Sequence, residues 1–265
     1  LLRGTGSLPV RFVGSALAGA GIAVSNVLLP GLVKRDFPSR AAMMTGLYTL
    51  AVCGGASSST AFTVPLERHV FDGSWAFTLA VWALPAALVL LLWAPQALAA
   101  GSPARGAAQV RAGKLWHDKL AWQVTLFMGL QSALAYIAMG WLAPILRERG
   151  LDGAVAGYVV AVSILVQLGT CLVIPSIAAR CRDQRALAVG LSVITLVAML
   201  ALIFAPLGGC WLWAVLLGLG QGGTFALALS LIVMRSPDAT TTAQLSAMAQ
   251  GVGYMLAASG PVLAG

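Results

Sequence analysis

The stretch that decides the fold is CWLWAVLLGLGQGGTFALALSLIVM, residues 210–234, which holds 25 residues and no charge. About 20 apolar residues span a bilayer as a helix, because a backbone in lipid must satisfy its own hydrogen bonds. The run contains GLGQGG at 218–223, which matches the G-x-G-x-x-G pattern of a dinucleotide-binding loop. That loop needs a preceding strand and a helix N-terminus. We therefore expect no nucleotide here, and interpret the glycines as a thin helix face that carries one polar side chain, Gln221.

The rest of the chain repeats this pattern. Of 265 residues, 59% are hydrophobic and 9% are charged, against roughly 25% charged in ordinary soluble domains. Such a composition predicts an all-α integral membrane protein with eight transmembrane helices. The apolar runs lie at 8–33, 41–66, 74–94, 121–146, 154–179, 186–206, 210–234 and 243–265. Within the third run, Pro85 is central and should kink its helix.

The net charge of +8 follows the topology of these runs. If the helices alternate in direction, eleven basic residues fall on one side and five on the other, which places the first side in the cytoplasm. The first set is Lys34, Arg35, Arg40, Arg105, Arg111, Lys114, Lys119, Arg180, Arg182, Arg185 and Arg235; the second is Arg3, Arg11, Arg68, Arg147 and Arg149. No basic run carries interleaved aromatic residues, so the expected partner is the lipid bilayer and not nucleic acid.

One connection is much longer than the others. Residues 95–120, PQALAAGSPARGAAQVRAGKLWHDKL, are rich in Ala, Gly and Pro and are typical of a flexible linker. Three helices precede it and five follow, and both chain ends look cut. We therefore expect residues 1–94 to be the last three helices of one six-helix bundle, 95–120 a cytoplasmic linker, and 121–265 the first five helices of a second bundle. This arrangement resembles the major-facilitator plan of twelve helices.

The predicted helices contain neutral polar groups near their middles. In the major-facilitator plan the fourth, seventh and tenth helices line a central cavity, and these carry Asn26, Gln131 and Gln221. An amide in hydrocarbon has to face another helix or water. The predicted substrate-binding set is Asn26, Gln131, Tyr136, Gln221, Gln250, Tyr254 and Arg11. Ordinary hydrogen bonding between helices is the alternative for the amides, and Arg11 either reaches the headgroups or attracts an anion.

Two further segments have two interpretations each. The run 41–66, which is the fifth helix of the twelve-helix plan, is polar at Thr45, Tyr48, Thr49, Ser59 and Thr63. These side chains either line the passage or only bend the helix. The segment PSIAARCRDQR (175–185) resembles a degenerate form of the cytoplasmic Gly-x-x-x-Asp-Arg motif of major facilitators. Its charges either pair with neighbouring helix ends or simply anchor the chain on the cytoplasmic side.

Metal and catalytic chemistry are not expected. All eight acidic residues, both histidines and the spacing of the four cysteines lack the pattern of a metal site or a catalytic cluster. The acidic residues all lie in connections, which argues against a proton or sodium relay in these helices; proton coupling stays unresolved. We expect no cofactor, no metal and no enzymatic activity.

Longer strings give the chain a family resemblance. AGAGIAVSNVLLPGLVKRDFP (18–38), MMTGLY (43–48), GLGQGGTFALALSLIVMRS (218–236) and AQLSAMAQGVGYMLAASGP (243–261) resemble the CynX/NimT (cyanate/2-nitroimidazole transporter) family of the major facilitator superfamily. The resemblance implies a multi-pass permease of the cytoplasmic membrane that moves a small polar or anionic organic solute by alternating access. The alternative is a non-transporting membrane subunit or solute sensor on the same scaffold.

Overall fold

The computed structural model describes residues 8–72, 74–99 and 115–264, and these ranges contain helices and no strand. The prediction of an all-α membrane protein is confirmed. The main helices are α1 (Leu8–Asp36), α2 (Ala41–His69), α3 (Trp75–Val81), α4 (Ala83–Ala99), α6 (Lys119–Glu148), α7 (Gly153–Arg180), α8 (Arg185–Phe204), α9 (Cys210–Met234) and α10 (Ala239–Ala264). Residues 100–114, the greater part of the predicted linker, lie outside the described ranges.

The chain forms two compact units. The smaller comprises Leu1–Asn26 and Gly55–Val110, and the larger comprises Val27–Gly54 and Arg111–Gly265. The second half of α1 and the first half of α2 therefore belong to the larger unit, together with α6 to α10. The predicted bundle boundaries at 94 and 120 stay a prediction.

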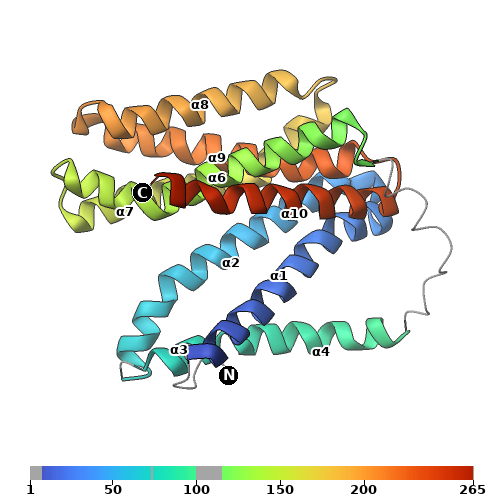
Figure 1. The fold of residues 1–265 in the computed structure, drawn as a ribbon, viewed down its shortest axis with the longest axis horizontal. Helices are drawn as coiled ribbons and strands as arrows, with labels where there is room; N and C mark the ends of the chain where they lie inside the picture. The colour runs from blue at the N-terminus through green and yellow to red at the C-terminus, as the bar shows by residue number, and fades with distance from the viewer. Residues whose placement is uncertain (1–7, 73, 100–114, 265) are drawn as a thin grey trace. The chain divides into compact units, whose positions relative to one another are not determined.

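Helix α9 is the centre of the larger unit. Sixteen of its 25 residues are buried, and it packs against α7 on one side and α8 on another, while α10 runs along α6 (Figure 1). The buried set combines small residues with Leu217, Leu227, Leu229, Ile232 and Val233. A helix that is apolar on all sides is stable here because neighbouring helices surround it.

The glycines of GLGQGG lie inside α9 and bring it against α7. A Cβ built on Gly218 would come 2.9 Å from Val166 Cβ, and one built on Gly222 would come 2.7 Å from Gln167 Cα. Real Cβ atoms almost never approach so closely. Since Gly218 and Gly222 are one helical turn apart, they form a groove that α7 fills.

A second pair of glycines faces α8. A Cβ on Gly220 would come 2.8 Å from Thr195 N, and one on Gly223 would come 2.6 Å from Leu191 Cδ2. The glycines therefore form two thin faces and not the single face predicted from the sequence. Their predicted role in packing inside a helix is confirmed.

Helices α6 and α10 use the same device. A Cβ on Gly129 would come 3.0 Å from Gly253 Cα, and a Cβ on Gly260 would come 3.2 Å from Ala133 Cβ. On α10, Ala257 lies between Gly253 and Gly260 and is also fully buried. Small residues at such spacing let two backbones approach in lipid, where van der Waals contact replaces the hydrophobic drive.

The outer surfaces are apolar, as a bilayer requires. Helix α4 exposes Leu88, Leu90, Leu91 and Leu92 by 59% to 70% of their surface, and no soluble domain leaves such a band uncovered. Six described helical segments are long and apolar enough to cross a membrane. Two of the eight predicted runs, 41–66 and 243–265, are helical as α2 and α10 but fall outside this set, because hydroxyl and amide side chains lower their hydropathy.

The third predicted run is not one helix. Helix α3 ends at Val81, Trp82 is its C-cap, and α4 starts at Ala83. Pro85 has no N–H to donate to the carbonyl of Val81, four residues earlier, and its ring crowds that carbonyl. The predicted kink therefore takes the form of a break. In the smaller unit, Trp82 Nε1 also donates to Thr63 Oγ1 at 3.2 Å.

The hydroxyl groups of α2 bond mainly within their own helix. Thr45 Oγ1 donates to Ala41 O at 2.8 Å, and Thr49 Oγ1 donates to Thr45 O at 2.7 Å. Both threonines are buried. The helix runs unbroken from Ala41 to His69, so intrahelical bonding satisfies these groups without interrupting the helix.

The packing of α9 predicts opposite effects for two glycine-to-alanine changes. Gly220→Ala should lower the free energy of unfolding by about 1–3 kcal/mol, because its Cβ meets the backbone of α8. Gly190→Ala, on α8, is the matched control, since a Cβ there meets nothing within 4 Å among the described residues. It should be neutral or stabilise the helix by up to about 1 kcal/mol. Thermal unfolding of the purified protein in detergent measures both, and equal effects would contradict this account of α9.

Candidate functional site

Three predicted amides lie at one depth in the larger unit. Gln131 stands 12 residues from the start of α6, Gln221 stands 13 from the end of α9, and Gln250 stands 11 from the start of α10. At about 1.5 Å per residue these are depths of about 18, 20 and 16 Å, close to the middle of a hydrocarbon core about 30 Å thick. All three depths are counted from the basic end, defined as the end of the larger unit that carries Lys34 and Arg235.

All three amides are buried and bonded. Gln131 Nε2 donates to Ser132 Oγ at 2.7 Å and to Met128 O at 3.2 Å. Gln250 Nε2 donates to Ser246 Oγ at 2.8 Å on its own helix. Local bonds of this kind keep an amide in place at little cost.

Gln221 is the amide that crosses between helices. Its Nε2 donates to Leu134 O of α6 at 3.5 Å, less than one helical turn from Gln131. The glycine faces of α9 point toward α7 and α8, which leaves the remaining face for Gln221 to reach α6. The structure therefore brings Gln131 and Gln221 to the same interface.

Two predicted residues belong to the smaller unit. Asn26 is half-buried near the middle of α1, and its membership of a common site with the glutamines stays a prediction. Arg11 lies in α1, but its side chain is outside the described residues, so both interpretations of Arg11 stay open.

Three tyrosines of the larger unit lie near one another. The side chains of Tyr136, Tyr48 and Cys53 lie close enough to Tyr254 to interact with it electrostatically. Tyr48 and Tyr254 pack on one apolar cluster that also contacts Phe127 and Phe225. The predicted set omitted Tyr48, for which the sequence left open whether it lines the passage or only belongs to a bent helix.

Two hollows of the described surface lie elsewhere. One of about 300 Å³ is lined by Asp118, Arg235 and Thr241, and another of about 350 Å³ is lined by Trp116, Gln244 and Met255. Neither is lined by the three central glutamines. The hollows therefore do not mark the predicted binding residues, which are packed in this conformation.

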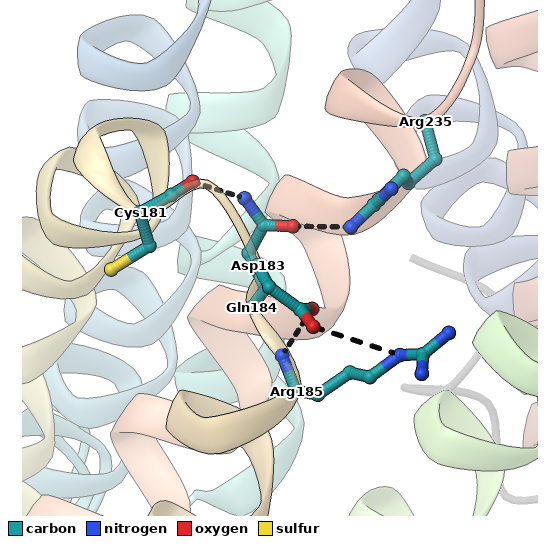
Figure 2. A network of polar contacts seen from close by, with 5 residues as sticks. All are labelled: Cys181, Asp183, Gln184, Arg185 and Arg235. Carbon is teal, nitrogen blue, oxygen red and sulfur yellow. Dashed lines mark hydrogen bonds and ion pairs between the residues drawn. The ribbon is translucent and has the colours of Figure 1, made fainter.

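A polar network holds the loop between α7 and α8 to the end of α9 (Figure 2). Gln184, only 6% exposed, donates from Nε2 to Cys181 O at 2.9 Å and to Ala178 O at 3.1 Å. Its Oε1 accepts from Arg235 Nη2 at 2.5 Å. A neutral side chain thus joins three helix ends.

The charges of this loop contribute less than predicted. Asp183 Oδ1 accepts from Arg185 N at 3.0 Å, and the Asp183–Arg185 ion pair is 3.9 Å long with both side chains largely exposed. Exposed pairs of this length are worth little. The contact with a neighbouring helix end that was predicted for the charges of this segment is made by the neutral Gln184, which no sequence pattern marked.

Metal ligands do not gather in the described part of the chain. Among its residues, no group of three or more His, Cys, Asp or Glu side chains could hold an ion. The acidic side chains that the structure describes lie at helix ends or between helices, as with the N-caps Asp118 and Asp152.

Comparison with known proteins gives the family. Residues 1–261 match the model of the Major Facilitator Superfamily. The chain is 40% identical to the 2-nitroimidazole transporter of Escherichia coli (strain K12), over 98% of this chain and 66% of that protein. It is 38% identical to a Bacillus subtilis (strain 168) protein named uncharacterized transporter YycB, over 100% of this chain and 66% of that protein.

A third relative is the cyanate transport protein CynX of Escherichia coli (strain K12), 31% identical over 94% of this chain and 64% of that protein. The chain thus spans about two thirds of the length of these relatives. It belongs to the Major Facilitator Superfamily, and within it to the CynX/NimT-like group that the sequence resemblance indicated.

The Gln184 network predicts a stability effect that the exposed charges of the same loop lack. Gln184→Ala removes the acceptor for Arg235 and the donors to two carbonyl groups, and should lower the free energy of unfolding by about 1–3 kcal/mol. Gln184→Glu keeps the acceptor and should lose less. Arg182→Ala, at an exposed position, is the control and should change stability little in the same thermal unfolding measurement. Equal losses for Gln184→Ala and Arg182→Ala would show that the network does not hold the helix ends together.

Proposed function

We propose that this member of the Major Facilitator Superfamily is a secondary transporter that moves a small polar or anionic organic solute, cyanate-like or nitroimidazole-like, by alternating access. The observation that carries the proposal is the common depth of Gln131, Gln221 and Gln250 on three packed helices. Amides near the midplane are positioned to meet a solute halfway across.

The chemistry of these groups favours a neutral or charge-delocalised solute. Amides and tyrosine hydroxyls both donate and accept hydrogen bonds, and they carry no charge that would hold a solute too tightly. A small anion such as cyanate, or a nitro group, accepts such bonds at several atoms. The named functions of two relatives, a 2-nitroimidazole transporter and a cyanate transport protein, support this class of solute.

The larger unit also supports alternating access. At the basic end, the second half of α1 and the first half of α2 pack against helices of the presumed second bundle. A Cβ on Gly31 would lie 3.2 Å from Ala243 Cβ, and one on Gly46 would lie 3.1 Å from Leu172 O. Lys34 Nζ donates to Val233 O at 3.2 Å. We assign these contacts to a conformer closed at the basic end, the end that the linker 95–120 places in the cytoplasm.

Substitution of one central amide tests the site. Gln221→Leu keeps the size of the side chain but removes its hydrogen bonds, and should lower the uptake rate of cyanate or 2-nitroimidazole into proteoliposomes by about tenfold, the equivalent of one hydrogen bond to a charged group. Gln131→Leu should act similarly. Gln123→Leu is the matched control, because Gln123 is an exposed residue of the same helix as Gln131 and should retain uptake.

The same experiment separates transport from sensing. Solute binding without uptake in the unaltered protein would favour the solute sensor. Uptake that Gln221→Leu and Gln131→Leu leave unchanged would remove these amides from the site while leaving the transporter assignment in place.

A further inference from the structure

Two thiols far apart in the sequence meet in the larger unit. Cys53 of α2 and Cys171 of α7 are 118 positions apart, yet their Sγ atoms lie 3.5 Å from each other. Both are thiols and not a disulfide. The other two cysteines, Cys181 and Cys210, have no such neighbouring thiol among the described residues.

The pair lies in apolar surroundings with access from one side. Cys171 has no exposed surface, and its Sγ lies 3.7 Å from Gly222 O on α9. Cys53 is half-buried and packs on the apolar cluster that contains Cys171. A Cβ built on the adjacent Gly54 would meet nothing within 4 Å among the described residues, so the side of the pair next to Gly54 is not closely packed.

We propose that Cys53 and Cys171 form a binding site for a divalent thiophilic cation that takes two ligands, such as Hg²⁺. Binding exchanges two S–H bonds for two sulfur–metal bonds and releases two protons to the solvent. No electron is transferred, and neither an oxidant nor a reductant is needed.

Charge selects this class of ion. A divalent cation with two thiolates is neutral, whereas a monovalent cation would leave one negative charge in an apolar interior, where an uncompensated charge is costly. The soft thiolate ligands also favour a soft cation, because the hard cations calcium and magnesium require a shell of oxygen ligands. Zinc normally takes four ligands, and the described part of the chain gathers no third His, Cys, Asp or Glu around an ion site.

The geometry requires only a small adjustment. A metal–thiolate bond is about 2.3 Å long for zinc, so a linear bridge needs sulfur atoms about 4.6 Å apart or slightly more. The Sγ atoms start at 3.5 Å and have to separate by about 1 Å. Rotation of the half-buried Cys53 side chain supplies a movement of this size without any shift of the helices.

A bridge between these atoms joins α2 to α7. Since the two helices belong to different presumed bundles, the bridge would also arrest alternating access; that consequence rests on the proposed function. Binding itself does not, and it is measured first.

The test uses the complete protein in detergent, with every cysteine other than the pair changed to serine, Cys181 and Cys210 among them. Hg²⁺ is titrated against a competing monothiol, and the affinity is read from the competitor concentration that removes the metal. The pair should bind one ion per chain. Adding Cys53→Ser or Cys171→Ser should weaken retention by about 10²-fold or more, since the second bond then becomes intermolecular.

A second measurement, the thermal unfolding midpoint, shows whether each variant is still folded. Hg²⁺ should raise the thermal unfolding midpoint of the protein with both thiols, because a ligand of the native state stabilises it, and should not raise that of either single variant. Cys53→Ala is the alternative variant where serine disturbs folding. Retention that is the same with one thiol as with two, or two ions bound independently per chain, would overturn the site. Both readouts stand whether or not the protein transports any solute.

Discussion

The larger unit depends on the direct approach of one helix backbone to its neighbours. In lipid, helices gain nothing from hiding apolar side chains from one another, so they associate through close contact. Helix α9 achieves this twice, with Gly218 and Gly222 against α7 and with Gly220 and Gly223 against α8. The order of residues along six positions therefore decides which helices touch α9, and it leaves one face on which Gln221 extends toward α6. Packing and the placement of the polar group follow from the same constraint.

The closeness of these contacts separates two kinds of interface. Within the presumed second bundle, added Cβ atoms at Gly220, Gly222 and Gly223 would come 2.6–2.8 Å from neighbouring atoms, so these interfaces require glycine. At Gly31 and Gly46, where α1 and α2 meet α10 and α7, the corresponding distances are 3.2 and 3.1 Å, which a small shift relieves. The α9 interfaces are therefore the least tolerant of added atoms, whereas the α6–α10 interface of the same presumed bundle, with 3.0 Å at Gly129 and 3.2 Å at Gly260, is as close as the contacts of α1 and α2.

Sequence reasoning reached the membrane class, most helix positions and the role of GLGQGG, because each follows from local rules: a backbone in lipid must be helical, and a glycine deep in an apolar run cannot be a phosphate loop. It also anticipated a defect at Pro85, although the break falls at Trp82. What it missed depends on contacts between distant positions. The two glycine faces of α9 pack against Val166 of α7 and Thr195 of α8. Gln184 joins the end of α9 because Arg235, 51 positions later, donates a hydrogen bond to it. No single-helix pattern encodes such pairs. The predicted substrate-binding residues occupy suitable depths, but depth alone does not show that they bind a solute.

Charge and neutral polarity have different tasks in this fold. The basic residues are predicted to set the orientation of the chain across the membrane through their number, and several of them lie at exposed positions, as Arg185 does in the long Asp183–Arg185 contact. The joints between helix ends pair a basic side chain with a neutral acceptor: Arg235 with the amide of Gln184, Lys34 with Val233 O, and Arg149 with two backbone carbonyls at 2.6–2.7 Å at the end of α8. Each of these joints places a single charged group at a helix end. The contact between α2 and α7 instead brings two uncharged thiols together, and the proposed ion would make a chemical bond across it.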